Sequence, residues 1–368
     1  MNVNLTIENG VKKFRSENYN YNFRLSDGFF QRWGKTLEDD PKWSPFSPEI
    51  CDIEISASGK NGGGCPIACS FCYKNNNNKP GVPDNMSLAT FKTILSKFPK
   101  FNGHYFLCQV AFGITSIGSH PEIFDIFQHC RDNQIIPNVT INGSDPLTDE
   151  QINNLVRLCG AMAISVVPPR EENGYNLIRR ILDRGGKQIN IHYVIHNKSI
   201  AEAYKVCDAI KNDLRLKGLN AIVFLGLKPK NRGQSFDVLP TSAYIKLVEY
   251  CFDNNIPFGF DSCSSPKTEL AVTNSTKLTE ELKKNILNCC ERCESTCFSF
   301  YLNQEGKYTP CSFGEDKDMS IDFLNTNDFL QDVWNSSTTT NWRKKLFSLN
   351  RECPIYPEIR IQSDEGVI

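Results

Sequence analysis

Three cysteines within eight residues carry the strongest chemical signal in this sequence. They are Cys65, Cys69 and Cys72, in the segment Gly62-Gly-Gly-Cys-Pro-Ile-Ala-Cys-Ser-Phe-Cys-Tyr73. Three thiolates can bind three irons of a cubane cluster and leave a fourth iron without a protein ligand, where a small molecule can bind. Structural zinc sites normally close with four protein ligands, so these three cysteines alone fit zinc poorly.

The same spacing has a structural alternative, because positions i, i+4 and i+7 share one face of a helix. Pro66 and the three glycines just before Cys65 argue against a continuous helix across all three cysteines. The segment therefore predicts a metal-binding loop.

A second group of cysteines lies between residues 263 and 353. Its members are Cys263, Cys289, Cys290, Cys293, Cys297, Cys311 and Cys353. Between two of them, the segment from Phe300 to Cys311 predicts a β-hairpin that turns at Glu305-Gly306, which would bring the flanking cysteines together. Because tetrahedral thiolate ligation suits both metals, iron–sulfur and zinc remain alternatives for this group.

Six short apolar runs after residue 49 predict buried strands, and stretches with helical periodicity lie between them. The predicted strands are Ile50–Ser56, Tyr105–Phe112, Ile136–Ile141, Met162–Val167, Gln188–Ile195 and Ala221–Leu227. The predicted helices are Ser87–Phe98, Pro121–Asn133, Thr148–Leu158, Asn176–Arg184, Ile200–Leu214 and Thr241–Asn254. Ser87 is a good N-cap, and Thr148 with Gln151 predicts a capping box.

Strands that alternate with helices predict parallel pairing through right-handed crossovers. Six units favour an α/β fold with a partial (β/α)6 TIM-like barrel, and an open doubly wound sheet is the alternative. We expect an irregular N-terminal extension at 1–49, the barrel at 50–260, and a small cysteine-rich α+β C-terminal domain at 261–368 that metal helps to stabilise. In either fold, function belongs at the carboxyl ends of the strands, and the cysteine triad directly follows the first strand.

Composition excludes several classes of protein. The chain has 368 residues and a formal net charge of −1, which predicts no broad attraction to nucleic acid or to acidic membranes. No apolar run approaches the roughly 20 residues that span a bilayer, and the polar N-terminus lacks a signal-peptide segment. We therefore expect a cytoplasmic protein.

At Cys65, Cys69, Cys72 and the following Tyr73, the chain resembles the radical S-adenosylmethionine superfamily, whose signature is Cys-x3-Cys-x2-Cys followed by an aromatic residue. The resemblance implies a 4Fe-4S cluster whose open iron binds S-adenosyl-L-methionine. One electron, supplied by a flavodoxin- or ferredoxin-type donor, then cleaves the sulfonium. The resulting 5′-deoxyadenosyl radical abstracts a hydrogen atom from a substrate, and Tyr73 corresponds to the position that packs near the adenine.

The resemblance extends to further cofactor contacts with less specific motifs. Gly113 matches part of a Gly-Gly-Glu motif, although Phe112 and Ile114 replace its first glycine and its glutamate. Asn142 lies in a Thr-x-Asn-Gly pattern that is frequent near the cofactor. Three polar residues within apolar strands are also candidates to contact it, or else make ordinary core hydrogen bonds: Ser165, Asn190 and His192.

The tail resembles a SPASM or Twitch extension through Cys293-x12-Gly306-x4-Cys311. This implies one auxiliary 4Fe-4S cluster, because most of the later cysteine run of a full SPASM domain is missing. The expected ligands are Cys263, Cys293, Cys311 and Cys353, with Cys289 or Cys297 as alternates. A structural zinc on the same cysteines is the alternative.

Enzymes with such an extension mostly modify peptides, so the resemblance implies a peptide or protein side chain as the substrate. Residues 1–49 are too few and too irregular for the leader-binding domain that many of those enzymes carry, which leaves room for a separate peptide-recognition protein. Two alternatives remain: a radical enzyme acting on a small molecule or nucleotide, and a non-enzymatic zinc-binding protein.

Two further features lie near the predicted barrel mouth. Lys228, Lys230 and Arg232 follow the sixth strand and could meet an acidic group, although a solvated loop is the favoured interpretation. Asp261 stands at the junction of barrel and tail, where it could transfer a proton, although a turn or capping role is favoured.

Overall fold

The computed structural model describes residues 3–58, 64–76, 83–315 and 317–361, so Gly62 and Gly63 of the triad segment lie outside the described residues. Its central feature is a ten-stranded sheet with the order β15-β14-β13-β12-β11-β10-β5-β16-β17-β18. The strands run over β5 Ile50–Glu54, β10 Gln109–Gly113, β11 Ile136–Asn142, β12 Ala161–Ser165, β13 Gln188–Ile195, β14 Ala221–Gly226, β15 Phe258–Phe260, β16 Ser299–Leu302, β17 Lys307–Thr309 and β18 Ile321–Asp322. Two short ribbons accompany the sheet: β6 Ser56–Ala57 with β7 Asp84–Asn85, and β8 Lys100–Phe101 with β9 His104–Tyr105.

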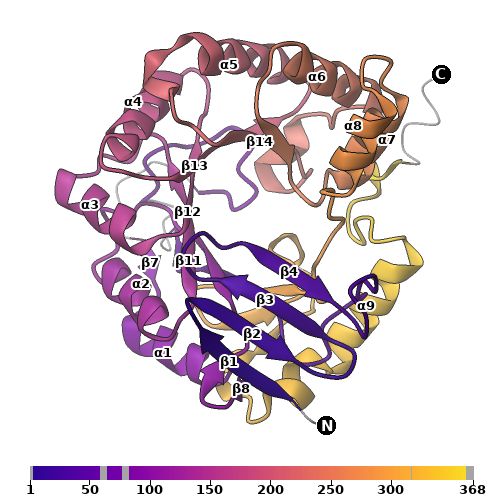
Figure 1. The fold of residues 1–368 in the computed structure, drawn as a ribbon. Coiled ribbons are helices and arrows are strands. Elements are labelled where there is room, and N and C mark those ends of the chain that lie inside the picture. The colour runs from indigo at the N-terminus through magenta and orange to yellow at the C-terminus, as the bar shows by residue number, and fades with distance from the viewer. Residues whose placement is uncertain (1–2, 59–63, 77–82, 316, 362–368) are drawn as a thin grey trace.

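The strands from β5 to β15 pair in parallel, and helices cover their outer side (Figure 1). These helices are α1 Leu88–Ser96, α2 Ile123–Asp132, α3 Asp149–Leu158, α4 Glu171–Leu182, α5 Ile200–Asn212 and α6 Thr241–Asp253. The predicted partial barrel and all six of its strand–helix units are confirmed, and β15 adds a strand that the sequence did not predict. Among the described helices, none combines the length and the apolar character needed to cross a membrane.

Local sequence explains where these elements begin and which way their side chains point. The Ser87 hydroxyl caps α1 by accepting a hydrogen bond from the Thr90 amide at 3.1 Å. The predicted capping box of α3 is present, with both reciprocal hydrogen bonds between Thr148 and Gln151. Along β13, fully buried residues alternate with partly exposed ones, so His192 points into the barrel while its neighbours pack against the helices.

Residues 1–49 are not irregular, and that prediction was wrong. They contain an antiparallel sheet in the order β1-β2-β3-β4, with β1 Asn4–Glu8, β2 Val11–Arg15, β3 Asn20–Arg24 and β4 Phe30–Trp33. The turn between β1 and β2 is Asn9-Gly10, both with positive φ (50° and 74°), which is the backbone that a tight hairpin requires. Apolar Leu5, Phe14 and Tyr21 alternate with polar residues and are fully buried.

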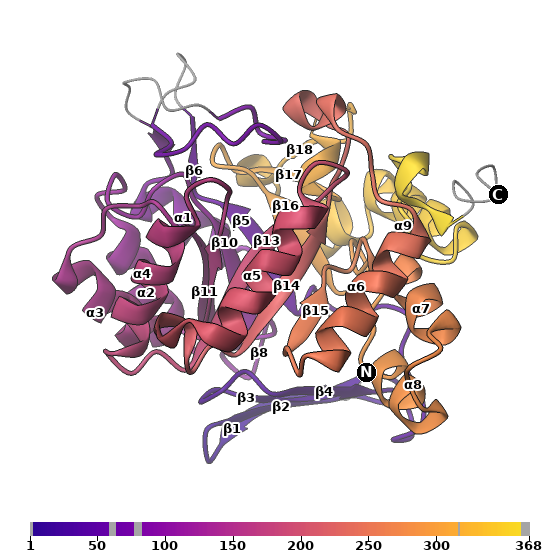
Figure 2. The same ribbon diagram turned by 90° about the horizontal axis from the view of Figure 1, so that it is seen from above.

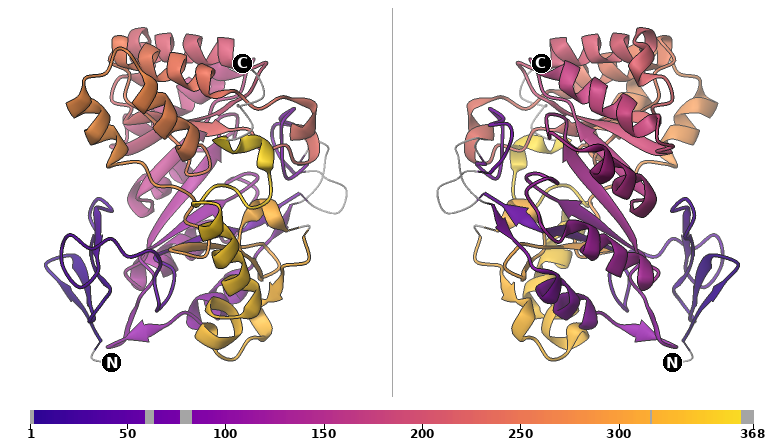
Figure 3. Two further views of the ribbon diagram at one scale, coloured as in Figure 1. Left: turned by 90° about the vertical axis from the view of Figure 1, so that its right-hand side faces the viewer. Right: turned by 90° about the vertical axis from the view of Figure 1, so that its left-hand side faces the viewer.

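This N-terminal sheet packs against the amino end of the barrel. Its buried face joins Phe106, Cys108 and Ile136, which stand just before or at the start of β10 and β11. The buried Lys12 ammonium donates hydrogen bonds to the carbonyls of Tyr105 (3.1 Å) and Leu107 (2.8 Å). Figures 2 and 3 show the sheet as a separate layer beneath the strands. The carboxyl ends of the strands therefore lie away from it.

The chain after residue 260, where we expected a small C-terminal domain, continues the barrel sheet and shares its hydrophobic core. Its helices are α7 Ser265–Asn274, α8 Glu280–Leu287 and α9 Ser337–Ser348, with the π-helical segment η5 Phe329–Trp334. Short 3-10 turns lie at η1 Leu214–Leu216, η2 Asn231–Ser235, η3 Ser312–Gly314, η4 Phe323–Asn325 and η6 Pro357–Ile359. Because β16 pairs in parallel with β5, and Phe300 and Trp334 belong to the barrel core, one hydrophobic core serves both regions.

The predicted hairpin at 300–311 is confirmed. β16 and β17 pair in antiparallel register, Gly306 has φ +74°, and its amide donates to the Asn303 carbonyl at 2.9 Å. The hairpin extends the barrel sheet past β5, as Figure 2 shows.

Candidate active site

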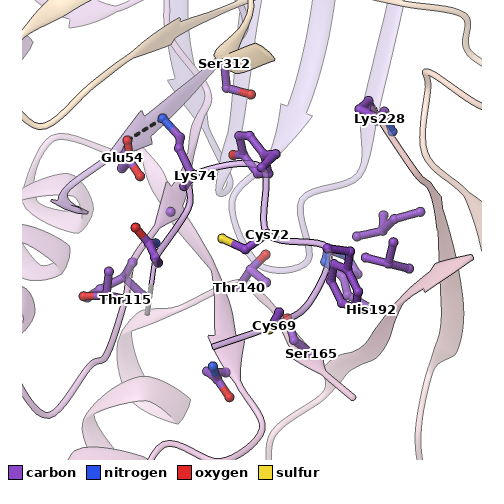
Figure 4. A pocket seen from close by; sticks show the side chains of 18 of the residues that line it. Glu54, Cys69, Cys72, Lys74, Thr115, Thr140, Ser165, His192, Lys228 and Ser312 are labelled. Carbon is purple, nitrogen blue, oxygen red and sulfur yellow. Dashed lines mark hydrogen bonds and ion pairs between the residues drawn. The ribbon is translucent and has the colours of Figure 1, made fainter. Parts of the chain in front are cut away.

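A cavity of about 480 Å³ opens at the carboxyl ends of the barrel strands. Pockets of this size suit small-molecule ligands and cofactors. Figure 4 shows side chains from the triad loop, the barrel strands and the tail directed toward it. Its lining includes Asp52, Glu54, Cys65, Cys69, Phe71, Cys72, Tyr73, Lys74, Gly113, Thr140, Asn142, Ser165, His192, Leu225, Lys228, Asp261, Tyr301, Ser312 and Phe313.

The three cysteines of the triad all line this cavity. Burial and the neighbouring thiols of Cys72 and Cys65 raise the pKa of Cys69 to about 12. Burial likewise raises the pKa of Cys65, while the Arg232 guanidinium nearby acts in the opposite direction. A bound metal ion would offset this cost of forming adjacent thiolates, since a coordinating thiol is held deprotonated.

The donor set fits an iron–sulfur cluster with an open iron, although it is not preassembled. Within the described residues, no three His, Cys, Asp or Glu side chains lie close enough together to coordinate one metal ion in their present conformations. The Cys65 thiol instead donates to the Ile67 carbonyl at 2.8 Å. As a cluster ligand this thiol would be a thiolate and would no longer donate that hydrogen bond.

Most of the predicted cofactor contacts lie around the same cavity. Asn142, Ser165 and His192 are register neighbours on β11, β12 and β13, which places them in one row across the barrel wall. Gly113 also lines the cavity, beside Glu54 on the neighbouring strand. Asn190 is not part of the lining. It lies two residues closer to the amino end of β13 than His192. Its side-chain oxygen accepts a hydrogen bond from the Asn220 side chain at 2.9 Å. The structure therefore favours the alternative for Asn190, an ordinary structural hydrogen bond.

Tyr73 connects the triad loop to the tail. Its ring lies 4.5 Å from that of Phe313, centroid to centroid, and both rings line the cavity. The Asn231 side chain donates to the Tyr73 carbonyl at 2.5 Å, which ties this loop to the segment after β14. The residue therefore stands in the wall of the cavity.

Lys74, the next residue, forms a network that sequence analysis missed. Its ammonium donates to Glu54 Oε2 and to the Tyr301 hydroxyl, both at 2.7 Å, and pairs with Glu315. The Tyr301 hydroxyl also donates to Glu54, at 2.7 Å. One signal was present: Asp52 and Glu54 alternate with the buried Cys51 and Ile53, so both acids of this strand must face the barrel interior.

We expect Lys74→Met to lower the free energy of unfolding by about 3 kcal/mol, because it leaves two enclosed carboxylates without their cation. The side chains of Lys74 and Glu54 are 13% and 9% exposed, so solvent screens the pair weakly. The measurement is urea unfolding followed by circular dichroism. Lys205→Met is the matched control, since the Lys205 side chain is 72% exposed and should cost less than about 1 kcal/mol. Equal losses in the two variants would contradict the prediction.

Burial lowers the pKa of His192 to about 4, so this imidazole is neutral in the folded protein at pH 7. The unfolded chain takes up the proton near pH 6.5, so stability is lost as the pH falls from about 6.5 to about 4. We expect His192→Gln to lose less stability than the wild type over this interval. Unfolding midpoints measured at several pH values test this, and parallel curves for the two proteins would contradict it.

The four tail cysteines that the resemblance implies as ligands lie in one region of the structure, although among the described residues no three such side chains stand close enough to hold a metal ion. Each of Cys263, Cys293 and Cys311 lies close enough to others of the set that their thiols mutually disfavour ionisation, and Cys353 contributes to all three. Burial, with Cys353 nearby, raises the pKa of Cys311 to about 12. This four-cysteine group has the donors of a closed tetrahedral thiolate site.

The other tail cysteines face different surroundings. Cys289 is exposed, and Cys290 lies beside Glu269 and Ser265. Cys297 is buried near Glu294 and the guanidinium groups of Arg351 and Arg343. The alternates Cys289 and Cys297 therefore lie outside the four-cysteine group.

The cations after β14 do not form a solvated loop, and that interpretation was wrong. Lys228 is 7% exposed and pairs with Asp261, while Lys230 donates to the Phe313 carbonyl at 3.1 Å. Arg232 donates to the Asn76 carbonyl. Asp261 also accepts hydrogen bonds from the Gly226 amide (3.2 Å) and the Ser264 hydroxyl (2.5 Å). These contacts agree with the turn or capping role that the sequence favoured for this aspartate.

No protein-family model matches the chain, and no curated protein matches its sequence. Among solved structures, Streptococcus suis SuiB bound to S-adenosylmethionine aligns with a TM-score of 0.59 and 14% identity, over 81% of this chain and 68% of SuiB. SuiB bound to its precursor peptide SuiA gives 0.54 and 14%, over 82% and 65%. A further SuiB structure gives 0.55 and 14%, over 92% and 88%. The resemblance to radical S-adenosylmethionine enzymes is thus confirmed at the level of the fold.

Proposed function

We propose that this protein is a radical S-adenosylmethionine enzyme that carries an auxiliary 4Fe-4S cluster and acts on a peptide or protein side chain. When bound, the cluster at Cys65, Cys69 and Cys72 supplies one electron that cleaves S-adenosylmethionine, and the 5′-deoxyadenosyl radical removes a hydrogen atom from the substrate. The observation that carries the proposal is a single cavity, which has the triad on its wall and the four-cysteine group close beside it.

The residues of the cavity have distinct tasks in this proposal. Asn142 and Ser165 offer hydrogen bonds from adjacent strands to the polar groups of S-adenosylmethionine. The ring of Tyr73 offers a flat apolar surface for the adenine. Neutral His192 can donate or accept one hydrogen bond without adding charge beside the cationic sulfonium.

The four-cysteine group lies on the tail side of the cavity. Lys228 lines the cavity, and its ammonium is near the Cys263 thiol, so one buried cation borders both sites. A cluster there could take up an electron from a substrate radical that forms in the cavity. Sequence analysis left zinc as the alternative for these cysteines, and the metal content of the purified protein decides between the two.

The SuiB structure that contains precursor peptide SuiA favours a peptide as the substrate. The β1–β4 sheet packs on the amino end of the barrel, and its apolar face is already buried there. Recognition of a peptide at the cavity by this sheet is therefore disfavoured, and we keep a separate peptide-recognition protein in the proposal. A flavodoxin- or ferredoxin-type protein would supply the electron.

Anaerobic reconstitution with iron and sulfide tests the proposed activity. We expect about eight irons per chain if both sites hold a 4Fe-4S cluster. Addition of dithionite and S-adenosylmethionine should then yield 5′-deoxyadenosine, detected by chromatography. Deuterium transferred into 5′-deoxyadenosine from labelled peptides, or from labelled small molecules, distinguishes the two substrate classes.

Two outcomes would defeat the proposal. One is zinc at both cysteine sites, with no iron taken up during reconstitution, which would support the non-enzymatic alternative. The other is a fully loaded protein that leaves S-adenosylmethionine intact under reducing conditions.

A further inference from the structure

A carboxylate on the first barrel strand faces the cavity with no side-chain partner among the described residues. Asp52 lies on β5, between the fully buried Cys51 and Ile53, and the strand alternation directs its side chain into the barrel. The residue is exposed, and it lines the cavity. Part of its accessible surface therefore belongs to the site.

The other acids that line the cavity are already neutralised. Glu54 is paired with Lys74 and accepts from the Tyr301 hydroxyl, and Asp261 is paired with Lys228. For Asp52, by contrast, no side chain among residues 3–58, 64–76, 83–315 and 317–361 forms an ion pair or hydrogen bond with the carboxylate. Its enclosure in the cavity raises the pKa of Asp52 to about 6. The carboxylate is thus mostly ionised at pH 7, with part of its hydration replaced by the walls of the cavity.

The position of Asp52 assigns it to the tail side of the cavity. Its register partner on the neighbouring strand β16 is Tyr301. The negative charge of Asp52 also contributes to the raised pKa of the Cys311 thiol. The row of Asn142, Ser165 and His192 comes from β11, β12 and β13, and β10 separates these strands from β5. Asp52 therefore lines the same cavity as the proposed S-adenosylmethionine contacts, on the side nearer Tyr301 and Cys311, and we place the substrate there.

We propose that Asp52 determines substrate specificity by forming an ion pair with a cationic group of the substrate, either an ammonium or a guanidinium. This inference rests on the proposed function, and it adds the chemical class of the group that is recognised. A ligand without that cation would displace water from the carboxylate and leave it unsatisfied, and such a penalty is how polar sites reject isosteres. A cationic group of the ligand that pairs with the Asp52 carboxylate compensates for the hydration that this carboxylate loses.

Binding of two capped amino acids tests the inference without any turnover. The probes are Nα-acetyl-lysine-N-methylamide and its norleucine counterpart, which differ at the end of the side chain by the ammonium group. Calorimetric titration uses the reconstituted protein with S-adenosylmethionine present. We expect the lysine probe to bind about tenfold tighter or more, since pairing of enclosed charges is worth at least that factor. An arginine probe covers the guanidinium case, and n-butylammonium distinguishes a free amine from a peptide side chain.

Asp52→Asn should abolish the preference between the lysine and norleucine probes, and Asp52→Glu should retain part of it. Asp125→Asn is the matched control, because Asp125 is exposed on the outer helix α2, and it should leave the preference unchanged. The affinity for S-adenosylmethionine should change less than threefold in Asp52→Asn. If Asp52→Asn does not fold, the comparison of the lysine and norleucine probes on the wild type still tests whether the site prefers a cationic ligand.

Three results would overturn the inference. They are a wild type that binds neither cationic probe better than the norleucine probe, a preference that survives in Asp52→Asn, and a large loss of S-adenosylmethionine affinity in that variant. The last result would place Asp52 in the cofactor site. Because the probes report binding and 5′-deoxyadenosine reports chemistry, failure of the proposed activity with an intact probe preference is distinguishable from failure of this inference.

Discussion

Cys69→Ser is expected to lose about four irons per chain after reconstitution, which is the content of one cubane cluster. Cys69 lies between Cys65 and Cys72 in the loop, and its thiol interacts with both of theirs, so no neighbouring cysteine of the triad can replace it. A serine hydroxyl is a poor ligand for iron. Loss of groups that merely orient ligands typically costs about 10–100-fold, so loss of a ligand should lower the 5′-deoxyadenosine rate more than about 100-fold.

The iron content of Cys289→Ser provides the control, because this thiol is exposed and lies outside both cysteine sites. That variant should match the wild type in iron and in rate. If Cys69→Ser kept the full iron content and the full rate, the triad would not be the site of S-adenosylmethionine cleavage.

The second large effect is expected for Cys311→Ser. This variant should lose the metal of the four-cysteine group but keep the triad cluster, so that about four irons and the cleavage of S-adenosylmethionine without substrate remain. We also expect a lower unfolding temperature, because metal bound in the native state adds its binding free energy to the stability of the fold. Iron and zinc determined by mass spectrometry, together with a thermal melt, measure both effects.

Cys297→Ser is the matched control for this experiment. Cys297 is buried in the same region, but it lies near Arg343 and Arg351 and apart from the four-cysteine group. Its substitution can cost stability through packing, but it should not change the metal content. Loss of metal from Cys297→Ser, with Cys311→Ser unaffected, would show that the group has been assigned to the wrong cysteines.

The sequence by itself determined the parts of this protein that depend on local patterns. The triad is specified by spacing within one loop, and the six strand–helix units follow from apolar periodicity of 2 and 3.6 residues. The capping box at Thr148 and Gln151 and the turn at Gly306 were likewise predicted, because caps and turns depend on a few adjacent residues.

Several misses came from signals that were weak or overlooked. The N-terminal sheet was taken as irregular because its strands are only four or five residues long, and an alternation over so few residues was overlooked. Lys228 and Arg232 looked like a solvated loop because a charged run carries no sign of the partners it will meet. Those partners, Asp261 and the Asn76 carbonyl, lie 33 and 156 residues away in sequence.

Only the tertiary structure decided which distant residues share the cavity. His192 lines it and Asn190 does not, since two residues along a strand change the height in the barrel but keep the same face. The resemblance selected Cys263, Cys293, Cys311 and Cys353 from the sequence, but their nearness in space depends on how the tail folds back along β5. Likewise, only the folded structure shows that Asp52 has no side-chain partner among the described residues, because a sequence does not show which charged residues pair.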